Sequence, residues 1–342
     1  MAAWPTKRMD QLCEITSSKR IFAADYVSEG VPFYRGREVT EKYKGNLDVS
    51  TELFITEEKF AEIERKFGAP KLGDLLLTSV GTLGSVYVVK PGDRFYFKDG
   101  NLTWFRNFKG LDSQFLFYWI GSPQGKAELQ KCTIGSSQSA FTIVLLKGIE
   151  IALPPMPVQQ RIATILSAYD ELIENSLRRI KILEAMARSL YREWFVHFRF
   201  PGHENHPRVA SALGEIPREW GVKTIQDFGK VVTGKTPSKA NAGFFGVNVP
   251  FVKTPDMHGN LFILGTNESL STAGASSQAN KTLPVGSICV SCIGTIGVVS
   301  ITTADCQTNQ QINSVVLAKS EYREFLFLRL QEAKQALENL GS

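Results

Sequence analysis

The 342-residue sequence is poor in the residues that metal, redox and membrane functions require. It contains four histidines and five cysteines, and no apolar run reaches the roughly 18 residues that a membrane span needs. The first residues, MAAWPTKRMD, lack the apolar core of a secretory signal. An odd number of cysteines without such a signal favours free thiols in a reducing compartment. We therefore expect a cytoplasmic protein with no metal site and no membrane partner.

Sequence motifs of enzymes are also missing. There is no Asn-Pro-Pro-Tyr or Asp-Pro-Pro-Tyr motif for amino-methyl transfer, no glycine-rich methyl-donor loop and no HExxH motif. His203 and His206 lie in a segment flanked by glycine and proline, which indicates solvated side chains. We predict that this chain holds no catalytic residue and no cofactor of its own.

Two short segments match motifs of other functions. Gly229–Thr236, GKVVTGKT, has P-loop spacing, and a P-loop needs a helix directly after it to bind phosphate. A proline and the segment SKANAG follow instead, so we favour contacts of Lys235 and Thr236 with a DNA phosphate, with a P-loop NTPase as the alternative.

Cys289 and Cys292 form a CxxC pair, but zinc needs about four ligands. We therefore expect Cys289 to be a buried strand residue.

The charge balance is mildly basic. Lysine and arginine number 39 against 34 aspartates and glutamates, a net charge of +5. The basic residues are spread along the chain without a polybasic segment. This balance permits a polyanionic partner such as nucleic acid, provided that folding gathers the positive charge on one surface.

The sequence contains one domain twice. Blocks at 4–20 and 220–236 share a tryptophan, a lysine three residues later and their apolar positions. The other blocks recur in the same order: VPF at 31–33 and 249–251, LGDLLLTSVGTLG at 72–84 and VGSICVSCIGTIG at 285–297, and FLF at 115–117 and 325–327. A conserved order of four blocks indicates two homologous copies.

Each copy is predicted to be rich in short strands. Apolar runs at 74–80 and 287–293 predict strands. Each run is followed by Gly-Thr-aliphatic-Gly, a turn that requires positive φ. Short helices are expected near 115–120 and 322–340.

A long helix is predicted between the copies, over 157–198. Pro157 suits its first turn, and no glycine or further proline interrupts it. At 1.5 Å per residue the helix would be about 60 Å long. Apolar residues at alternating steps of four and three indicate a coiled coil; an amphipathic core helix is the alternative. The predicted helix interface comprises Ile162, Leu166, Tyr169, Ile173, Ile180, Leu183, Leu190 and Trp194.

The polar segments between the shared blocks differ between the copies. Segments 34–45 and 251–260 are expected to be polar loops, and CQTNQQINS at 306–314 takes the place of KDGNLTW at 98–104. Arginine binds guanine, asparagine and glutamine pair with adenine, and lysine neutralises phosphate. A solvated charged loop is the alternative, but a shared scaffold with different loops is expected of two DNA readers. The predicted DNA-binding residues are Lys19, Arg20, Tyr34, Arg35, Arg37, Lys42, Lys44, Thr82, Asn101, Thr103, Lys235, Thr236, Lys253, Thr254, His258, Asn260, Thr295, Asn309, Gln310, Gln311 and Asn313.

Together these features resemble the DNA-specificity subunit of type I restriction–modification systems. The resemblance rests on LPPMPVQQRIATIL at 153–166, MARSLYREWFVHFRFPG at 186–202, LGEIPREW at 213–220 and the tandem repeat. The chain departs from the family pattern at Gln159, where glutamate is common. It also stops before the second long helix that pairs antiparallel with the first in the family, so we expect a C-terminally truncated subunit.

The resemblance implies an α+β fold, with two homologous mixed α/β target-recognition domains joined by a long coiled-coil-type helix. The expected domains are 1–156 and 199–342, the second lacking its C-terminal end, with the spacer helix at 157–198. Each domain would read half of a bipartite site in double-stranded DNA. The subunit would be non-catalytic and position methylation and restriction subunits, which would use S-adenosylmethionine, ATP and Mg. Another specificity chain is the expected partner of the helix. A structural coiled-coil adaptor without DNA binding is an alternative.

Overall fold

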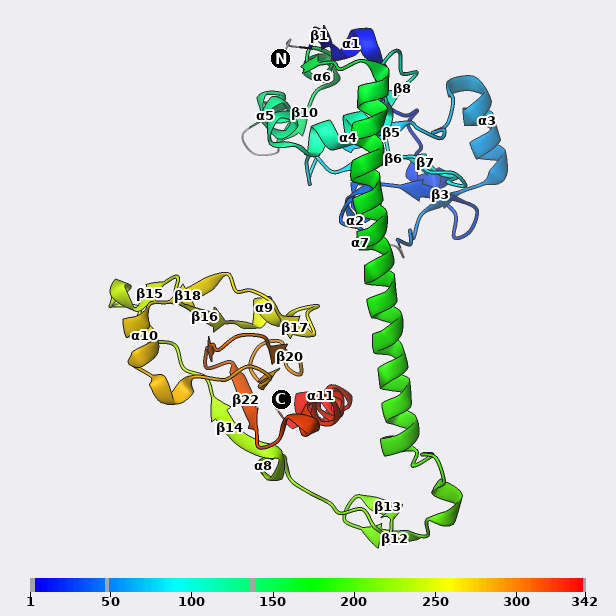
Figure 1. Ribbon diagram of the computed structural model, residues 1–342. Coiled ribbons are helices and arrows are strands. Elements are labelled where there is room, and N and C mark those ends of the chain that lie inside the picture. Colours follow the sequence, from blue (N-terminus) through cyan, green and yellow to red (C-terminus); the bar gives the residue numbers. More distant parts are fainter. Residues whose placement is uncertain (1–3, 47–48, 136–138, 341–342) are drawn as a thin grey trace. The chain divides into compact units, whose positions relative to one another are not determined.

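The computed structural model describes residues 4–46, 49–135 and 139–340 (Figure 1). The chain divides into two compact units, Met1–Arg179 and Ile180–Ser342, and the division falls inside the long helix α7, Met156–Tyr191. Over the described ranges, no helix has both the length and the apolarity to cross a bilayer.

The first unit contains two main sheets. One is antiparallel, with the order β2 (Glu14–Thr16), β8 (Leu102–Arg106), β5 (Leu75–Thr78) and β6 (Val86–Val88). The other has the order β4 (Phe54–Ile55), β3 (Val31–Tyr34) and β7 (Tyr96–Phe97). In the second sheet β3 and β7 are parallel, so their carboxyl ends meet at the same edge. Small ribbons join β1 (Thr6–Arg8) to β11 (Glu150–Ala152) and β9 (Thr133–Ile134) to β10 (Ala140–Phe141).

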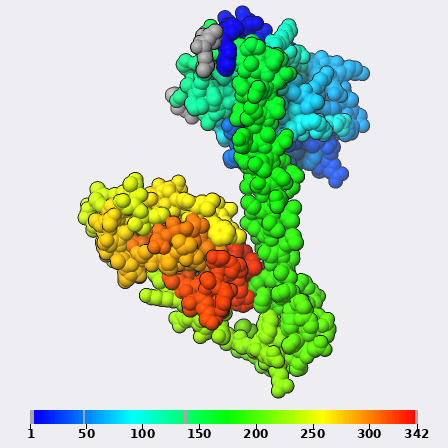
Figure 2. All heavy atoms as spheres, in the orientation of Figure 1, coloured from blue at the N-terminus to red at the C-terminus, as the bar shows by residue number. Residues whose placement is uncertain are grey.

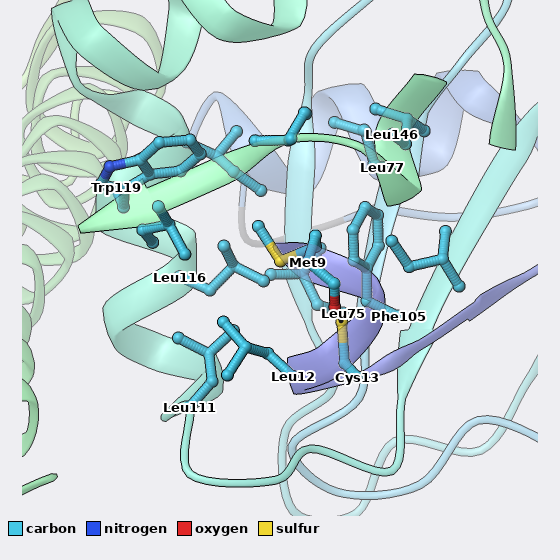
Figure 3. Packing of buried hydrophobic residues seen from close by; sticks show 14 of the residues in the cluster. Met9, Leu12, Cys13, Leu75, Leu77, Phe105, Leu111, Leu116, Trp119 and Leu146 are labelled. Carbon is cyan, nitrogen blue, oxygen red and sulfur yellow. Dashed lines mark hydrogen bonds between the residues drawn. The ribbon is translucent and has the colours of Figure 1, made fainter. Parts of the chain in front are cut away.

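Helices cover the antiparallel sheet and close the core of the first unit. Helix α4 (Ser113–Gly121) begins where the Asp112 carboxylate accepts the backbone N–H of Phe115 at 2.8 Å, and it confirms the helix predicted near 115–120. The helix packs against β6, and its Leu116 and Trp119 lie in the same core cluster as Leu75, Leu77 and Phe105 of β5 and β8 (Figure 3). The other helices of this unit are α1 (Met9–Leu12), α2 (Gly36–Tyr43), α3 (Glu57–Phe67), α5 (Pro123–Lys131) and α6 (Ile143–Lys147).

The second unit repeats this architecture. One sheet has the order β14 (Gly229–Thr233), β22 (Ile312–Leu317), β19 (Ile288–Ser291), β20 (Val299–Thr302) and β17 (Phe262–Ile263). The other has the order β15 (Phe245–Gly246), β18 (Glu268–Leu270), β16 (Val249–Val252) and β21 (Gln307–Thr308). The hairpin β12 (Arg208–Ser211)–β13 (Gly214–Pro217) precedes them, and the helices are α8 (Ile225–Phe228), α9 (Thr254–Met257), α10 (Thr272–Ser276), α11 (Arg323–Glu332) and α12 (Lys334–Leu340).

The topology confirms the predicted duplication. The order β2-β8-β5-β6 recurs as β14-β22-β19-β20, and the parallel pair β3–β7 recurs as β16–β21. Gly81 and Gly84 in the first unit, and Gly294 and Gly297 in the second, all have φ between 78° and 84°. The glycine turns predicted from the sequence therefore have the backbone conformation that requires glycine.

Helix α7 is slightly shorter than predicted. It runs for 36 residues from Met156 to Tyr191, about 54 Å at 1.5 Å per residue. A π-helical turn, Arg192–Val196, follows, and Phe198 with φ 56° ends the helical path. The prediction of 157–198 therefore includes a terminal segment that is not α-helical.

Two segments expected to be loops contain helices instead. Segment 34–45 consists mainly of α2, and segment 251–260 contains the end of β16 and α9. Each helix begins with the same cap, in which the side chain of the acidic third helical residue accepts the backbone N–H of the residue before the helix. Glu38 accepts the Arg35 N–H at 2.8 Å, and Asp256 accepts the Lys253 N–H at 2.9 Å. The sequence prediction misses this local capping because the charges alone suggest a solvated loop.

Candidate nucleic-acid interface

In the first unit, four segments meet where β3 and β7 end. They are 17–20, 35–37, 80–84 and 98–101, and we call them the first loop edge. Backbone N–H groups hold them together: Lys98 donates to the Tyr34 carbonyl, and Ser79 donates to the Asn101 carbonyl, each at 2.8 Å. The Ser18 hydroxyl donates to the Phe97 carbonyl at 2.8 Å. Segments distant in sequence thus form one polar surface.

The second unit forms an equivalent surface from 234–237, 253–256, 293–297 and 309–311, the second loop edge. Asn309 N–H donates to the Val252 carbonyl at 3.2 Å, and Cys292 N–H donates to the Gln311 carbonyl at 2.7 Å. Lys235 N–H donates to the Thr308 carbonyl at 2.9 Å. The bonds of Asn309 and Cys292 match the two backbone bonds of the first loop edge and make Gln311 the counterpart of Asn101. The Lys235 bond takes the place of the Ser18 hydroxyl bond.

Charged side chains dominate the first loop edge. Arg20 donates from Nε to Asp99 at 2.8 Å. The Glu38 side chain is fully buried, with Arg35 Nη2 at 3.3 Å and Arg37 Nε at 3.4 Å from Oε1. The carboxylate therefore orients two guanidinium groups at the start of α2, which suits contact with phosphate or guanine.

Amide side chains dominate the second loop edge. The Thr236 hydroxyl donates to Gln310 Oε1 at 2.7 Å, and Asn309 Nδ2 donates to Gln311 Oε1 at 2.9 Å. Beneath them, buried Gln278 donates from Nε2 to the Lys235 carbonyl and to Gln307 Oε1, both at 2.8 Å. Lys253 pairs with Glu268. Lys235 is exposed in the same edge, which therefore presents amide groups together with a lysine charge.

Some predicted DNA-binding residues are buried in the structure. Tyr34 stacks on Phe95 with ring centroids 4.3 Å apart, and burial raises its pKa to about 12, so the hydroxyl stays protonated. Thr103 Oγ1 lies 2.7 Å from Ser79 Oγ inside the sheet. Thr254 and Asn309 are also buried. These side chains are buried in this structure and support the loop edges. Their contact with DNA stays a prediction.

Four other predicted residues lie outside the hydrogen-bonded loop edges. Lys42 and Lys44 lie at the other end of α2, and Lys42 Nζ lies 4.8 Å from the centre of the Tyr87 ring. In the second unit His258 is exposed after α9, and Asn260 donates from Nδ2 to the Asp256 carbonyl at 3.1 Å. We place these four at the flanks of the candidate interfaces. Thr82 and Thr295 are exposed in the glycine turns, and Asn313 donates to Cys292 Sγ at 3.3 Å.

Lys98 is a candidate DNA contact that the sequence prediction missed. It is exposed at the carboxyl end of β7, next to the Arg20–Asp99 pair. The signal lay in KDGNLTW, where Lys98 follows the two aromatic residues of a buried strand. Recognising that β3 and β7 are parallel would have placed it beside Arg35.

The geometry does not support a P-loop or a metal site. After β14, residues 234–240 are irregular and no helix begins there. This position therefore lacks the helix N-terminus whose free N–H groups hold phosphate in a P-loop. Gly234 instead packs against Asn309, whose carbonyl oxygen would be 2.0 Å from an added Cβ. Within the described ranges, no group of histidine, cysteine or acidic residues could hold a metal. Cys289 is fully buried, and burial raises its pKa to about 11.

Most of the predicted helix interface is exposed. Ile162 packs partly against the core of the first unit, and Trp194 is half-buried. Figure 2 shows α7 in green, uncovered on its visible face. A groove of about 750 Å³ runs along the part of α7 in the first unit, lined by Leu166, Ile173 and Leu177. The exposed fractions are 38% for Leu166, 63% for Tyr169, 57% for Ile173, 50% for Ile180, 60% for Leu183 and 51% for Leu190.

The start of α7 is held by a buried polar side chain. Gln159 is fully buried, and its Oε1 accepts the Asp112 N–H at 2.9 Å. Its Nε2 donates to the carbonyls of Gly110 at 3.1 Å and Pro154 at 2.8 Å. Two carbonyl acceptors favour an amide over a carboxylate, so glutamine at this position has a physical reason.

The end of α7 is held by aromatic packing. Tyr191 and Phe195 contact Phe325 of α11, with ring centroids 5.8 Å and 4.9 Å apart, and Arg192 pairs with Glu332 at 2.9 Å. Phe325 belongs to the repeated FLF block, as Phe115 does in α4. Helix α4 also contacts α7, because the Tyr118 hydroxyl donates to Asp170 at 2.6 Å. The equivalent helices α4 and α11 thus each contact a different part of α7.

Comparison with known proteins agrees with this architecture. The type I restriction modification DNA specificity domain model matches residues 1–185 and 217–342. The type I restriction enzyme HindI specificity subunit of Haemophilus influenzae is 30% identical over 333 residues, covering 77% of this chain and 70% of that protein. The MjaIX specificity subunit of Methanocaldococcus jannaschii is 29% identical over 260 residues, covering 73% of this chain and 57% of that protein.

A solved structure shows the same fold. The S subunit of a type I restriction-modification system from M. genitalium has a TM-score of 0.58 at 15% identity, covering 98% of this chain and 79% of that one. The family model accounts for most of the chain, including both copies of the repeat. The chain belongs to the type I restriction modification DNA specificity family and is a specificity subunit.

Proposed function

We propose that each loop edge reads one half of a bipartite site in double-stranded DNA. The observation that supports this most is the repeat itself. Two equivalent backbone bonds hold both loop edges, but ion-paired side chains predominate on the first edge and amides on the second. Scaffold bonds that are kept while the exposed groups differ are what two readers of different base sequences require. Exposed lysines would contact phosphates and supply most of the affinity.

The chemistry would belong to partner subunits. Methylation subunits would transfer a methyl group from S-adenosylmethionine to adenine, and a restriction subunit would use ATP and Mg to cleave DNA. The specificity chain would hold these subunits at the site and carry no catalytic residue. This assignment follows from membership of the family together with the absence of enzyme motifs in the sequence.

Helix α7 would pair with a helix of another specificity chain. Its exposed stripe from Tyr169 to Leu190 is apolar, and exposed stripes of this length are normally covered. The groove beside Leu166, Ile173 and Leu177 continues this stripe along the first unit. Light scattering of the isolated chain should show self-association, and a monodisperse monomer would contradict the pairing.

Domain exchange tests the two-reader model. Residues 199–342 would be replaced by the second domain of a specificity subunit with a different site, and the methylated sequence determined in cells. We expect one half-site to change and the other to stay. A change in both halves, or in neither, would refute the model. Fluorescence anisotropy with mixed duplexes at low salt tests the adaptor alternative, which predicts no binding.

A further inference from the structure

The orientation of the Gln311 amide on the second loop edge is fixed by its own backbone. The Gln311 N–H can only donate, and it donates to an Asn309 side-chain atom at 3.1 Å, which must therefore be Oδ1. The other Asn309 atom is then Nδ2, a donor, 2.9 Å from Gln311. The Gln311 atom that faces it must be the acceptor Oε1. This chain of bonds leaves Nε2 as the outward group of Gln311.

Nε2 of Gln311 is available for a ligand. Among the described residues no acceptor takes its hydrogens, and the side chain is half-buried. Nε2 is not one of the fully buried polar atoms that lack a partner, so it reaches solvent. The group lies over the glycine turn, where an idealised Cβ on Gly294 would stand 3.8 Å away. Gln311 thus differs from a free glutamine, which offers a donor and an acceptor together, as adenine requires.

We propose that Gln311 selects guanine in the half-site read by the second unit, an inference that rests on the proposed function. In the major groove guanine presents two acceptors, N7 and O6, which match the two hydrogens of Nε2. Adenine presents its N6 donor beside N7, cytosine presents a donor, and thymine presents one acceptor. The prediction that glutamines here pair with adenine is therefore replaced for Gln311.

Asn309 is a positioning residue in this scheme. It is buried, and its bond determines which atom of the Gln311 amide is left without a partner. An aspartate at 309 would still accept the Gln311 backbone N–H, and its second oxygen would require a donor from the Gln311 side chain. The amide would then turn and present Oε1 outward, with Gln311 itself unchanged.

The test is selection from a randomised duplex pool by the full chain in complex with its methylation subunits. The wild-type complex should enrich a bipartite motif that contains a guanine sensitive to Gln311. Gln311→Glu keeps an acceptor for Asn309 and presents an acceptor outward, so that position should change to cytosine or adenine by about tenfold or more. Asn309→Asp should change the same position in the same direction, while Gln311→Ala should lose the preference without gaining another.

The half-site read by the first unit serves as the folding control, because it should be unchanged in all three variants. If the Gln311-sensitive position is adenine in the wild type, or if Gln311→Glu leaves the motif unchanged, the inference is wrong. If Asn309→Asp has no effect while Gln311→Glu does, the positioning role of Asn309 is wrong. Failure of the wild-type complex to enrich any motif would instead contradict the proposed function.

Discussion

The two loop edges show how one scaffold can hold two different sets of polar side chains. The first edge holds its long side chains by ion pairs, with Arg20 on Asp99 and two arginines on buried Glu38. The second edge holds its side chains by neutral hydrogen bonds among Thr236, Asn309 and two glutamines. Since two equivalent backbone bonds lie beneath both edges, the main difference lies in the loop side chains. Salt should therefore affect the two edges differently.

The counterparts Asn101 and Gln311 make this difference concrete. Both give their carbonyl to the strand before the glycine turn. Gln311 is locked by Asn309, whereas the Asn101 amide has no hydrogen-bond partner among the described residues. Asn101 therefore keeps both a donor and an acceptor available, the pattern that suits adenine. Under the proposed function, the two equivalent positions would favour different bases.

The largest expected effect is a loss of stability at Gly234 of the second edge, where two backbone segments lie too close together for a side chain. In Gly234→Ala the new Cβ would lie 2.0 Å from the Asn309 carbonyl oxygen and 2.3 Å from Thr308 Oγ1. We expect a loss of about 3 kcal/mol in the free energy of unfolding, because backbone must move. The matched change in the first unit, Ser18→Ala, removes one hydrogen bond and should cost about 1 kcal/mol. Thermal denaturation of both variants measures the difference, and equal melting temperatures would contradict it.

The next largest effect should be a difference in stability between variants of the two helix-capping carboxylates, Glu38 and Asp256. Glu38→Gln disturbs the Arg35 backbone bond and both guanidinium contacts, and we expect a loss of about 2 kcal/mol. Asp256→Asn disturbs neutral donors, the N–H of Lys253 and the amide groups of Asn267, and should cost roughly half as much. Chemical denaturation provides the values. A larger loss for Asp256→Asn would show that the arginine contacts of Glu38 add no stability.

Salt dependence should separate the two edges in binding. Replacing Lys19 and Lys98 by alanine should reduce the steepness of log K against log salt by about 0.9 for each phosphate that is no longer neutralised. Gln310→Ala on the second edge should leave the slope unchanged and reduce the preference for the cognate sequence by about tenfold. Anisotropy titrations at several salt concentrations measure both. An unchanged slope in the double lysine variant would place these lysines away from DNA.

The smallest expected effect is a change in melting temperature when Asp74 is replaced. Its counterpart in the second unit is Ser287. Burial raises the pKa of the Asp74 carboxyl, although Lys71 N–H and Trp104 Nε1 both donate to Oδ2. A raised pKa in the folded state favours the protonated form, so this contribution to stability is lost as pH rises through that pKa. Asp74→Asn keeps an oxygen for both donors and should melt slightly above the wild type at neutral pH. The difference should vanish below about pH 4, the usual aspartate pKa, and a difference that grows on acidification would contradict the sign.

Features that repeat along the chain are predictable from the sequence. The duplication, the strands before the glycine turns and the long helix can be predicted because each leaves a periodic or repeated pattern in the sequence. The helices α2 and α9 escape prediction, since their caps depend on one acidic residue that a charged loop would also contain. The burial of Thr103 and Tyr34 also escapes it, because polar groups in a sheet look like surface residues until their partners are known.

The sequence by itself determined the two-copy architecture, the scaffold glycines and the candidate polar segments. Tertiary structure decided which side-chain atoms of those segments face outward. The reason is that the deciding bonds join residues distant in sequence, such as Thr236 with Gln310 and Arg20 with Asp99. Even the short bond between Asn309 and Gln311 acquires meaning only when β16 and β21 bring the second loop edge together. Composition can suggest amide readers, but only the folded chain orients them.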